Sequence, residues 1–231
     1  MCEQIMNAVS LSAIDAIVRR RSVRRFLSTP VPVADVSTIL DWAARAPSGT
    51  NIQPWQVHVV TDAARTRLSE AVLAAARDEK RSDEYAYMPA TLKDIHLARR
   101  RQVGFALYSL YGIERGDLAS RKEAMLRNFT FFGAPVGLFF TMDRYLLAGS
   151  WLDSGMFMQN VMIAAQAVGL ATCPQQAWCE YGGIVHQVLG IPDDQILISG
   201  MALGYEDVLA TENQLRTERA PAHVFTTYHA D

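Results

Sequence analysis

The segment from Trp151 to Leu170, WLDSGMFMQNVMIAAQAVGL, is apolar almost all the way round a helix. A helix without a polar face is central in a fold or lies in a subunit interface. Two further runs, Pro135–Met142 and Gln195–Gly204, are almost continuously apolar, as in strands that are buried on both faces. Gly169 is expected to cap the helix at its C-terminal end. The second half of the chain therefore predicts buried strands and one central helix.

The spacing of apolar residues predicts further helices over residues 11–21, 34–46, 63–80, 97–112 and 117–128, and a strand at Gln56–Thr61. Ser12 and Asp15 resemble a capping box, and the first helix is expected to run straight into a basic segment. Helices outnumber the scattered strands, which favours an α+β fold. No Pro/Gly/Ser-rich linker divides the chain, so residues 1–231 are expected to form a single domain.

The charge balance argues against a general nucleic-acid binder. The chain carries 22 Lys and Arg against 24 Asp and Glu, whereas such binders have a basic excess over the whole domain. The three cysteines show no C-x-x-C spacing, which points to a reducing cytosol. The N-terminal stretch lacks the pattern of a signal peptide, and no run of about 18 apolar residues occurs. We therefore expect a cytoplasmic protein without nucleic-acid or membrane partners.

Several motifs that carry enzyme chemistry are absent. No Rossmann phosphate turn, P-loop or G-x-S-x-G elbow occurs, and five scattered histidines indicate no metal site. Cys173 is interpreted as a small buried residue rather than a nucleophile. Asp143 and Asp153 are interpreted as caps or surface groups rather than an acid–base pair. An enzyme with this sequence would need a cofactor to carry its chemistry.

The basic segment RRRSVRRF, residues 19–26, places five arginines within seven residues of a chain whose net charge is −2. Arg20 and Arg24 share a face if the segment is helical, and they can converge across a bend if it is not. Guanidinium forks and the Ser22 hydroxyl together suit a phosphate dianion. The alternative is a solvated basic helix end, favoured by the helix dipole.

A second polar stretch, APSGTNIQPW at residues 46–55, holds short hydrogen-bonding side chains between two prolines. Such a loop can present these side chains to a ligand from a rigid frame. The alternative is an ordinary turn between a helix and a strand.

These two stretches, followed in order by GLATCPQQAW at residues 169–178 and GYEDVLATENQLRTERAP at residues 204–221, resemble the nitroreductase family of FMN-dependent oxidoreductases. The resemblance covers nearly the whole chain. The central FFGAPVGLFF is similar to members that reduce nitrobenzoates and other nitroaromatics. The resemblance implies a central, mostly antiparallel sheet flanked by helices. It also implies an intertwined homodimer with two FMN sites at its interface.

The resemblance also implies a set of flavin-binding residues. Those expected at the phosphate end and ring edge are Arg20, Arg21, Ser22 and Arg24, with Arg219 as a late phosphate ligand. Those expected to reach the flavin from the other subunit are Pro47, Ser48, Gly49 and Asn51. Those expected along the ring are Pro174, Gln175 and Gln176, with Asn128 at its edge. Many members have a lysine at the position of Thr217, and Arg216 is the candidate substitute.

The chemistry implied is electron transfer from NAD(P)H to FMN and then to a nitro group, in ping-pong fashion and without a catalytic protein residue. Residues 80–130 are expected to form a variable wall or lid over the flavin. The candidates for stacking on a flat substrate are Tyr85, Tyr87, Phe105, Tyr108, Phe129, Phe131 and Phe132, with core packing as the alternative for each. Quinones, flavins or halogenated aromatics are alternative acceptors. A non-enzymatic dimeric module that binds an acidic partner or RNA is the remaining alternative.

Overall fold

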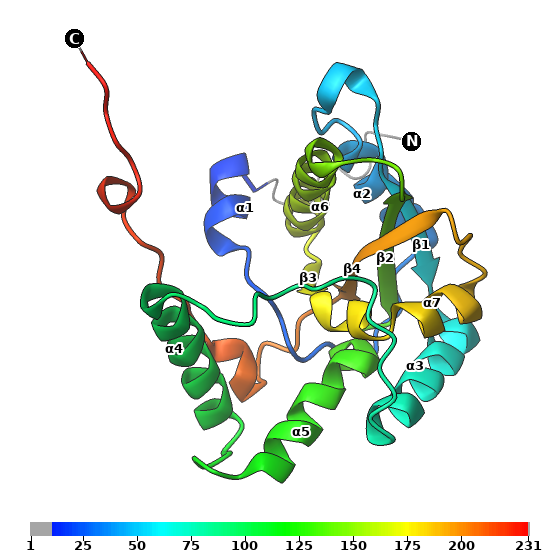
Figure 1. Ribbon diagram of the computed structural model, residues 1–231, viewed down its shortest axis with the longest axis vertical. Helices are drawn as coiled ribbons and strands as arrows, with labels where there is room; N and C mark the ends of the chain where they lie inside the picture. The colour runs from blue at the N-terminus through cyan, green and yellow to red at the C-terminus, as the bar shows by residue number, and fades with distance from the viewer. Residues whose placement is uncertain (1–10, 231) are drawn as a thin grey trace.

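The computed structural model describes residues 11–230, so Cys2 lies outside the described residues. This part of the chain forms seven α-helices and four strands (Figure 1). They are α1 Ala13–Arg19, α2 Val33–Ala43, β1 Gln56–Val60, α3 Asp62–Arg77, α4 Asp94–Leu110, α5 Leu118–Leu126, β2 Val136–Asp143, α6 Ala148–Ala167, β3 Ala171–Gln175, α7 Gly182–Leu189 and β4 Gln195–Gly204.

The four strands form one antiparallel sheet in the order β1-β2-β4-β3. The register between β2 and β4 shifts after Phe140, which pairs with Ser199, because the next residue, Thr141, pairs with Leu197. Ile198 is therefore an extra residue in β4 and forms a bulge. The sheet and its flanking helices confirm the expected α+β fold.

Helices cover both faces of the sheet. Alternate side chains of β2 point to opposite faces and pack against the helices on each side. Those that pack towards α2 and α6 are all fully buried: Val136, Leu138, Phe140 and Met142. Phe139 points to the other face and packs edge-on against Trp178, with ring centroids 5.1 Å apart. Leu68 and Val72 of α3 and Val185 of α7 complete this second layer. The sheet thus lies between two helical layers (Figure 1).

Two glycines in the sheet allow aromatic rings to lie directly on the backbone. A Cβ at Gly137 would overlap the ring of Phe131, and a Cβ at Gly200 would overlap the indole of Trp178. Both rings are fully buried in the layer on this face of the sheet. Close ring-to-backbone packing therefore depends on the missing side chains at these positions.

The first predicted helix was too long at its C-terminal end, because α1 ends at Arg19 and the arginines beyond it are in extended chain. Ser22 forms a parallel bridge with Thr172 of β3, and the Val23 N–H donates to the Thr172 carbonyl at 3.0 Å. The basic segment thus adds to the open edge of the sheet. Neither β3 nor α7 was predicted. Pro174 argues against a strand, but an edge strand tolerates it.

The long apolar helix was predicted correctly, although α6 begins three residues earlier, at Ala148. Gly169 follows it with φ of +75°, as expected of a C-terminal cap. The interpretation of Asp153 was wrong: this α6 residue is neither a cap nor exposed. Its carboxylate is buried and accepts a hydrogen bond from the Gly49 N–H at 3.2 Å. It therefore ties the polar loop after α2 to the central helix.

Within residues 80–130, the helices α4 and α5 extend away from the sheet, and none of the α4 side chains is buried (Figure 1). Three of the aromatic candidates for substrate stacking, Phe129, Phe131 and Phe132, are instead core residues, so the alternative was correct for them. Tyr87 and Phe105 remain exposed. Among residues 11–230, no helix is both long enough and apolar enough to span a membrane.

Candidate functional site

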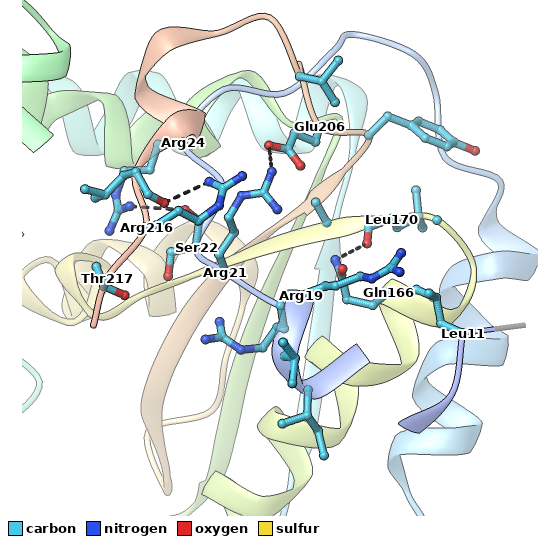
Figure 2. A pocket seen from close by; sticks show the side chains of 18 of the residues that line it. Leu11, Arg19, Arg21, Ser22, Arg24, Gln166, Leu170, Glu206, Arg216 and Thr217 are labelled. Atoms are coloured by element: carbon cyan, nitrogen blue, oxygen red, sulfur yellow. Dashed lines mark hydrogen bonds and ion pairs between the residues drawn. The ribbon is translucent and has the colours of Figure 1, made fainter. Parts of the chain in front are cut away.

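A pocket of about 1230 Å³ opens where the basic segment, the edge of β3 and the chain after β4 meet (Figure 2). The basic segment reaches it because Ser22 pairs with β3, and the later chain reaches it because the Leu27 N–H donates to the Tyr205 carbonyl at 2.9 Å. Six arginines line this arginine pocket: Arg19, Arg20, Arg21, Arg24, Arg216 and Arg219. Segments almost 200 residues apart in sequence thus supply its charge.

The positive charge of the arginine pocket is largely uncompensated. Arg21 forms a salt bridge with Glu206 (Figure 2), and none of the other five arginines forms a salt bridge with any residue in the range 11–230. Burial, and then the nearby charge of Arg219, lowers the pKa of Arg20. A guanidinium held close to a like charge is stabilised by an anion. The pocket therefore suits a phosphate group.

The arginines of the pocket keep hydrogen-bond donors free. Arg24 donates through Nη1 to the Ser22 carbonyl at 3.2 Å, and Arg216 donates through Nη1 to the Asn213 carbonyl at 2.8 Å. Arg219 donates through the same atom to the Thr217 hydroxyl at 2.7 Å. Each guanidinium has five donors, so most remain available to a ligand. Arg216 lies in the pocket together with Thr217, as its expected role as a substitute requires.

Pro174, Gln175 and Gln176 form the ring segment, which is expected to lie along the flavin ring. The side chains of its two glutamines point into the protein. Gln175 is 2% exposed and donates to the Asn128 carbonyl at 2.7 Å, and Gln176 donates to the Ile198 carbonyl at 2.6 Å. The Asn128 amide itself donates to the Met125 carbonyl at 2.9 Å. A ligand beside this segment would thus meet backbone atoms and Pro174 rather than glutamine amides.

The loop of Pro47, Ser48, Gly49 and Asn51 does not line the arginine pocket of its own chain. Its backbone is unusual, because Thr50, Asn51 and Gln53 all have positive φ, between 48° and 62°. Left-handed conformations at non-glycine residues are unfavourable and cluster at ligand sites. The Asp153 carboxylate and the Ser48 hydroxyl, which accepts from the Gln53 N–H at 3.0 Å, hold this shape.

Cys173 lies beside the basic segment and is buried, as expected of a small core residue. Burial raises the pKa of its thiol to about 11, so the thiol is protonated near neutral pH. A protonated thiol is a poor nucleophile. Cys179 is also buried, and the same cause raises its pKa to about 12.

The residues that hold the basic segment in place were not predicted from the sequence. They are Glu206, Glu212, Asn213 and Arg127, which bond to Arg21, Arg25 or the backbone of Arg24. Arg127 begins the short helix η3 (Arg127–Gly133) before β2, whereas the other three follow β4 in a segment that has neither a helical nor a strand period. Their burial and their contacts with the basic segment arise only in the folded chain, so no sequence signal could have found them.

The structure is thus an α+β protein with an antiparallel four-stranded sheet between helical layers and an arginine-lined pocket at the open edge of the sheet. The model of the Nitroreductase family matches residues 17–205, and the chain belongs to this family. The 4-nitrobenzoate reductase of Pseudomonas putida is 41% identical over 215 residues, covering 93% of this chain and 94% of that protein. The chloronitrobenzene nitroreductase of Comamonas testosteroni is 40% identical over 218 residues, covering 93% and 96%.

A solved structure gives the same result for the fold. The FMN and NADPH-dependent nitroreductase NfnB from Sphigopyxis sp. strain HMH superposes with a TM-score of 0.92 at 41% sequence identity, covering 96% of this chain and 100% of that chain. The family resemblance read from the four motifs is therefore confirmed.

Proposed function

We propose that this chain is an FMN-dependent NAD(P)H oxidoreductase that reduces nitroaromatic compounds. The observation that carries the proposal is the arginine pocket, whose uncompensated charge matches a phosphate monoester. The relatives named as nitrobenzoate and chloronitrobenzene reductases supply the substrate class. Bound FMN supplies the redox chemistry, passing electrons from the nicotinamide to the nitro group.

The chain's own residues bind and orient the flavin. Arg20 and Arg219 would hold the phosphate, with Arg24 and Arg216 in the same pocket and Ser22 as a hydroxyl donor. Arg21 is held by its salt bridge with Glu206, and the family resemblance implies that it would serve at the phosphate end or the ring edge. The ring segment Pro174–Gln176 presents backbone atoms, because its side-chain amides are engaged inside the protein. A rigid strand edge keeps the flavin in one orientation.

We further propose that the protein is a cytosolic homodimer. The helices α1 and α6 pack together and carry large exposed apolar side chains: Ile14 is 73%, Val18 76% and Leu152 71% exposed. Large exposed apolar side chains on two neighbouring helices are typical of an interface. In the dimer, the loop of Pro47, Ser48, Gly49 and Asn51 would contribute to the flavin site of the other subunit. Sedimentation of the purified protein at twice the chain mass supports this, and a monomer that binds FMN contradicts it.

The test of the function is anaerobic oxidation of NADPH and NADH by the FMN-loaded protein with 4-nitrobenzoate. We expect consumption of nicotinamide that depends on the nitro compound and yields a hydroxylamine or amine. A protein that is purified colourless and takes up no added FMN contradicts the proposal. Faster turnover with quinones, free flavin or halogenated aromatics than with every nitro compound would instead support the alternative acceptors.

A further inference from the structure

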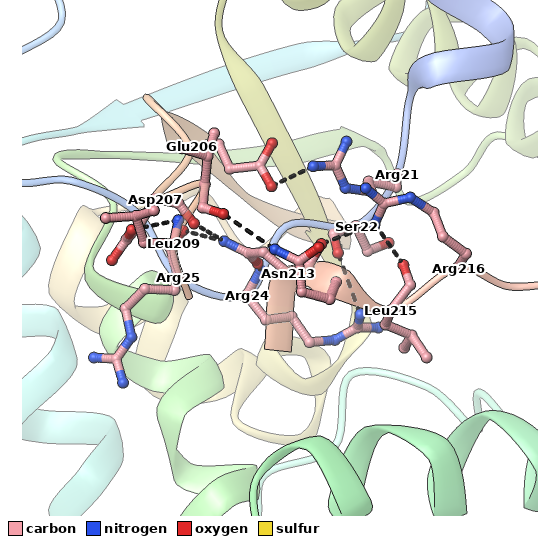
Figure 3. Close-up of polar contacts among 12 residues, drawn as sticks. Arg21, Ser22, Arg24, Arg25, Glu206, Asp207, Leu209, Asn213, Leu215 and Arg216 are labelled. Atoms are coloured by element: carbon pink, nitrogen blue, oxygen red, sulfur yellow. Dashed lines mark hydrogen bonds and ion pairs between the residues drawn. The ribbon is translucent and has the colours of Figure 1, made fainter. Parts of the chain in front are cut away.

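One buried side chain holds the backbone of Arg24 and Arg25 in place. Asn213, in the short helix η5 (Thr211–Gln214), is 2% exposed. Its Oδ1 accepts from the Arg24 N–H at 2.7 Å, and its Nδ2 donates to the carbonyls of Arg25 and Asp207 at 2.8 and 2.9 Å (Figure 3). These bonds replace those that a neighbouring strand would supply. The position of the Arg24 backbone is therefore set by the chain after β4.

The neighbouring Glu212 is also buried and takes two guanidinium partners. Its Oε1 accepts from Arg25 Nε at 3.1 Å and from Arg127 Nη2 at 2.7 Å. The same Nη2 of Arg127 donates to the Arg24 carbonyl at 2.9 Å. A buried carboxylate is tolerated when its charge is paired and hydrogen-bonded. Glu212 thus compensates Arg25 and joins Arg127 to the backbone of the basic segment.

The two adjacent arginines are thereby directed to opposite sides. In Figure 3 the Arg25 side chain points away from Ser22, whereas the Arg24 side chain runs towards Ser22 and donates to its carbonyl. Arg24 lines the arginine pocket and Arg25 does not. The Glu212 carboxylate therefore holds the Arg25 guanidinium outside the pocket, whereas the Arg24 guanidinium lies inside it without a carboxylate partner.

We infer that Glu212 and Asn213 are positioning residues for the phosphate of the cofactor. Neither lines the arginine pocket, and both act through Arg24 and Arg25. The inference rests on the proposed function. Simple electrostatics predicts that removing a negative charge near the pocket strengthens phosphate binding. The inference predicts the opposite, because loss of the Glu212 carboxylate would displace Arg24 and weaken phosphate binding.

The test measures dissociation constants of FMN and riboflavin for the full-length apoprotein, by quenching of flavin fluorescence. Riboflavin lacks the phosphate, so the ratio of the two constants reports the phosphate contribution alone. In Glu212→Gln we expect FMN affinity to fall by roughly tenfold, as for one misplaced charged hydrogen bond, with riboflavin affinity unchanged. Glu218→Gln is the matched control, because it removes the same charge from an exposed site in the same part of the chain.

Simple electrostatics predicts equal or higher FMN affinity for Glu218→Gln, and the same result in Glu212→Gln would overturn the inference. An equal loss of FMN and riboflavin affinity would also overturn it, since the effect would not belong to the phosphate. Should Glu212→Gln fail to fold, Arg127→Lys keeps the charge but removes the guanidinium that bridges Glu212 and the Arg24 carbonyl. The same selective loss is then expected, and no loss overturns the inference. Wild-type protein that binds FMN no better than riboflavin would instead refute the phosphate assignment in the proposed function.

Discussion

Arg20 and Arg219 bring like charges from opposite ends of the sequence into one pocket. Burial and the charge of Arg219 lower the pKa of Arg20, so this pairing is unfavourable until an anion arrives. Alanine at either position should weaken FMN binding by roughly 1.5–3 kcal/mol, the usual loss for a charged hydrogen bond. Titration of the apoprotein with FMN measures the change directly.

The control for these two variants is Arg45→Ala, which removes an exposed arginine that does not line the pocket. Its FMN affinity should equal that of the wild type. If both pocket variants also retain wild-type affinity, the phosphate lies elsewhere.

The contact between Gly200 and Trp178 gives a second prediction at the residue scale. A methyl group at Gly200 would overlap the buried indole, so Gly200→Ala should destabilise the fold by about 1–3 kcal/mol or more. Gly104→Ala is the matched control, because nothing lies within 4 Å of its added Cβ and alanine favours the helix. Urea unfolding of both variants checks this, and equal stabilities would contradict the packing described.

At the scale of elements, the polar loop after α2 depends on one carboxylate of α6. Removing it in Asp153→Ala removes the hydrogen bond from the Gly49 N–H, and because Gly49 is exposed we expect a cost of about 0.5–1.5 kcal/mol, as for a typical hydrogen bond. We expect faster hydrogen exchange of the amides in residues 48–53, while the amides of the sheet keep their protection. Asp41→Ala, an exposed change on α2, serves as the control. Unchanged exchange in the loop would show that Asp153 does not hold it.

The elements that could be predicted from the sequence are those whose own residues show a clear hydrophobic pattern. Gln195–Gly204 and the long helix were found because their residues are apolar almost throughout. The strand Ala171–Gln175 was not, because it is short, lies at an edge and contains Pro174. The first helix was expected to reach Arg21, with a helix or a bend left open beyond it, but the pairing of Ser22 with Thr172 makes the basic segment extended. A contact with a residue 150 positions away leaves no local pattern.

The same distinction applies to the candidate site. Arginine and serine are residue types that suit phosphate, so the sequence alone indicated them as candidates. The structure brings the expected arginines and Ser22 together in one pocket. Their supports, Glu206, Glu212 and Asn213, come from a segment with no period and are brought close only by the fold. Asp153 was misread because its acceptor role depends on a loop about 100 residues earlier.

For the whole molecule, the buried Glu212 links stability to pH. Burial opposes its ionisation, but hydrogen bonds and the charges of Arg127 and Arg25 outweigh this and lower its pKa. Its contribution is therefore complete above the unfolded pKa, about 4.3, and is lost as the pH falls through the lower folded pKa. Wild type should exceed Glu212→Gln in free energy of unfolding at pH 6–7, and the difference should shrink below about pH 4.3. Chemical denaturation across this range would contradict the account if the difference were constant.

The central claim is that the arginine pocket holds the phosphate of a bound flavin. A crystal structure of the protein loaded with FMN tests it most directly. We expect the phosphate oxygens within about 2.7–3.2 Å of guanidinium nitrogens of Arg20 and Arg219. A phosphate group bound away from both arginines would contradict the claim.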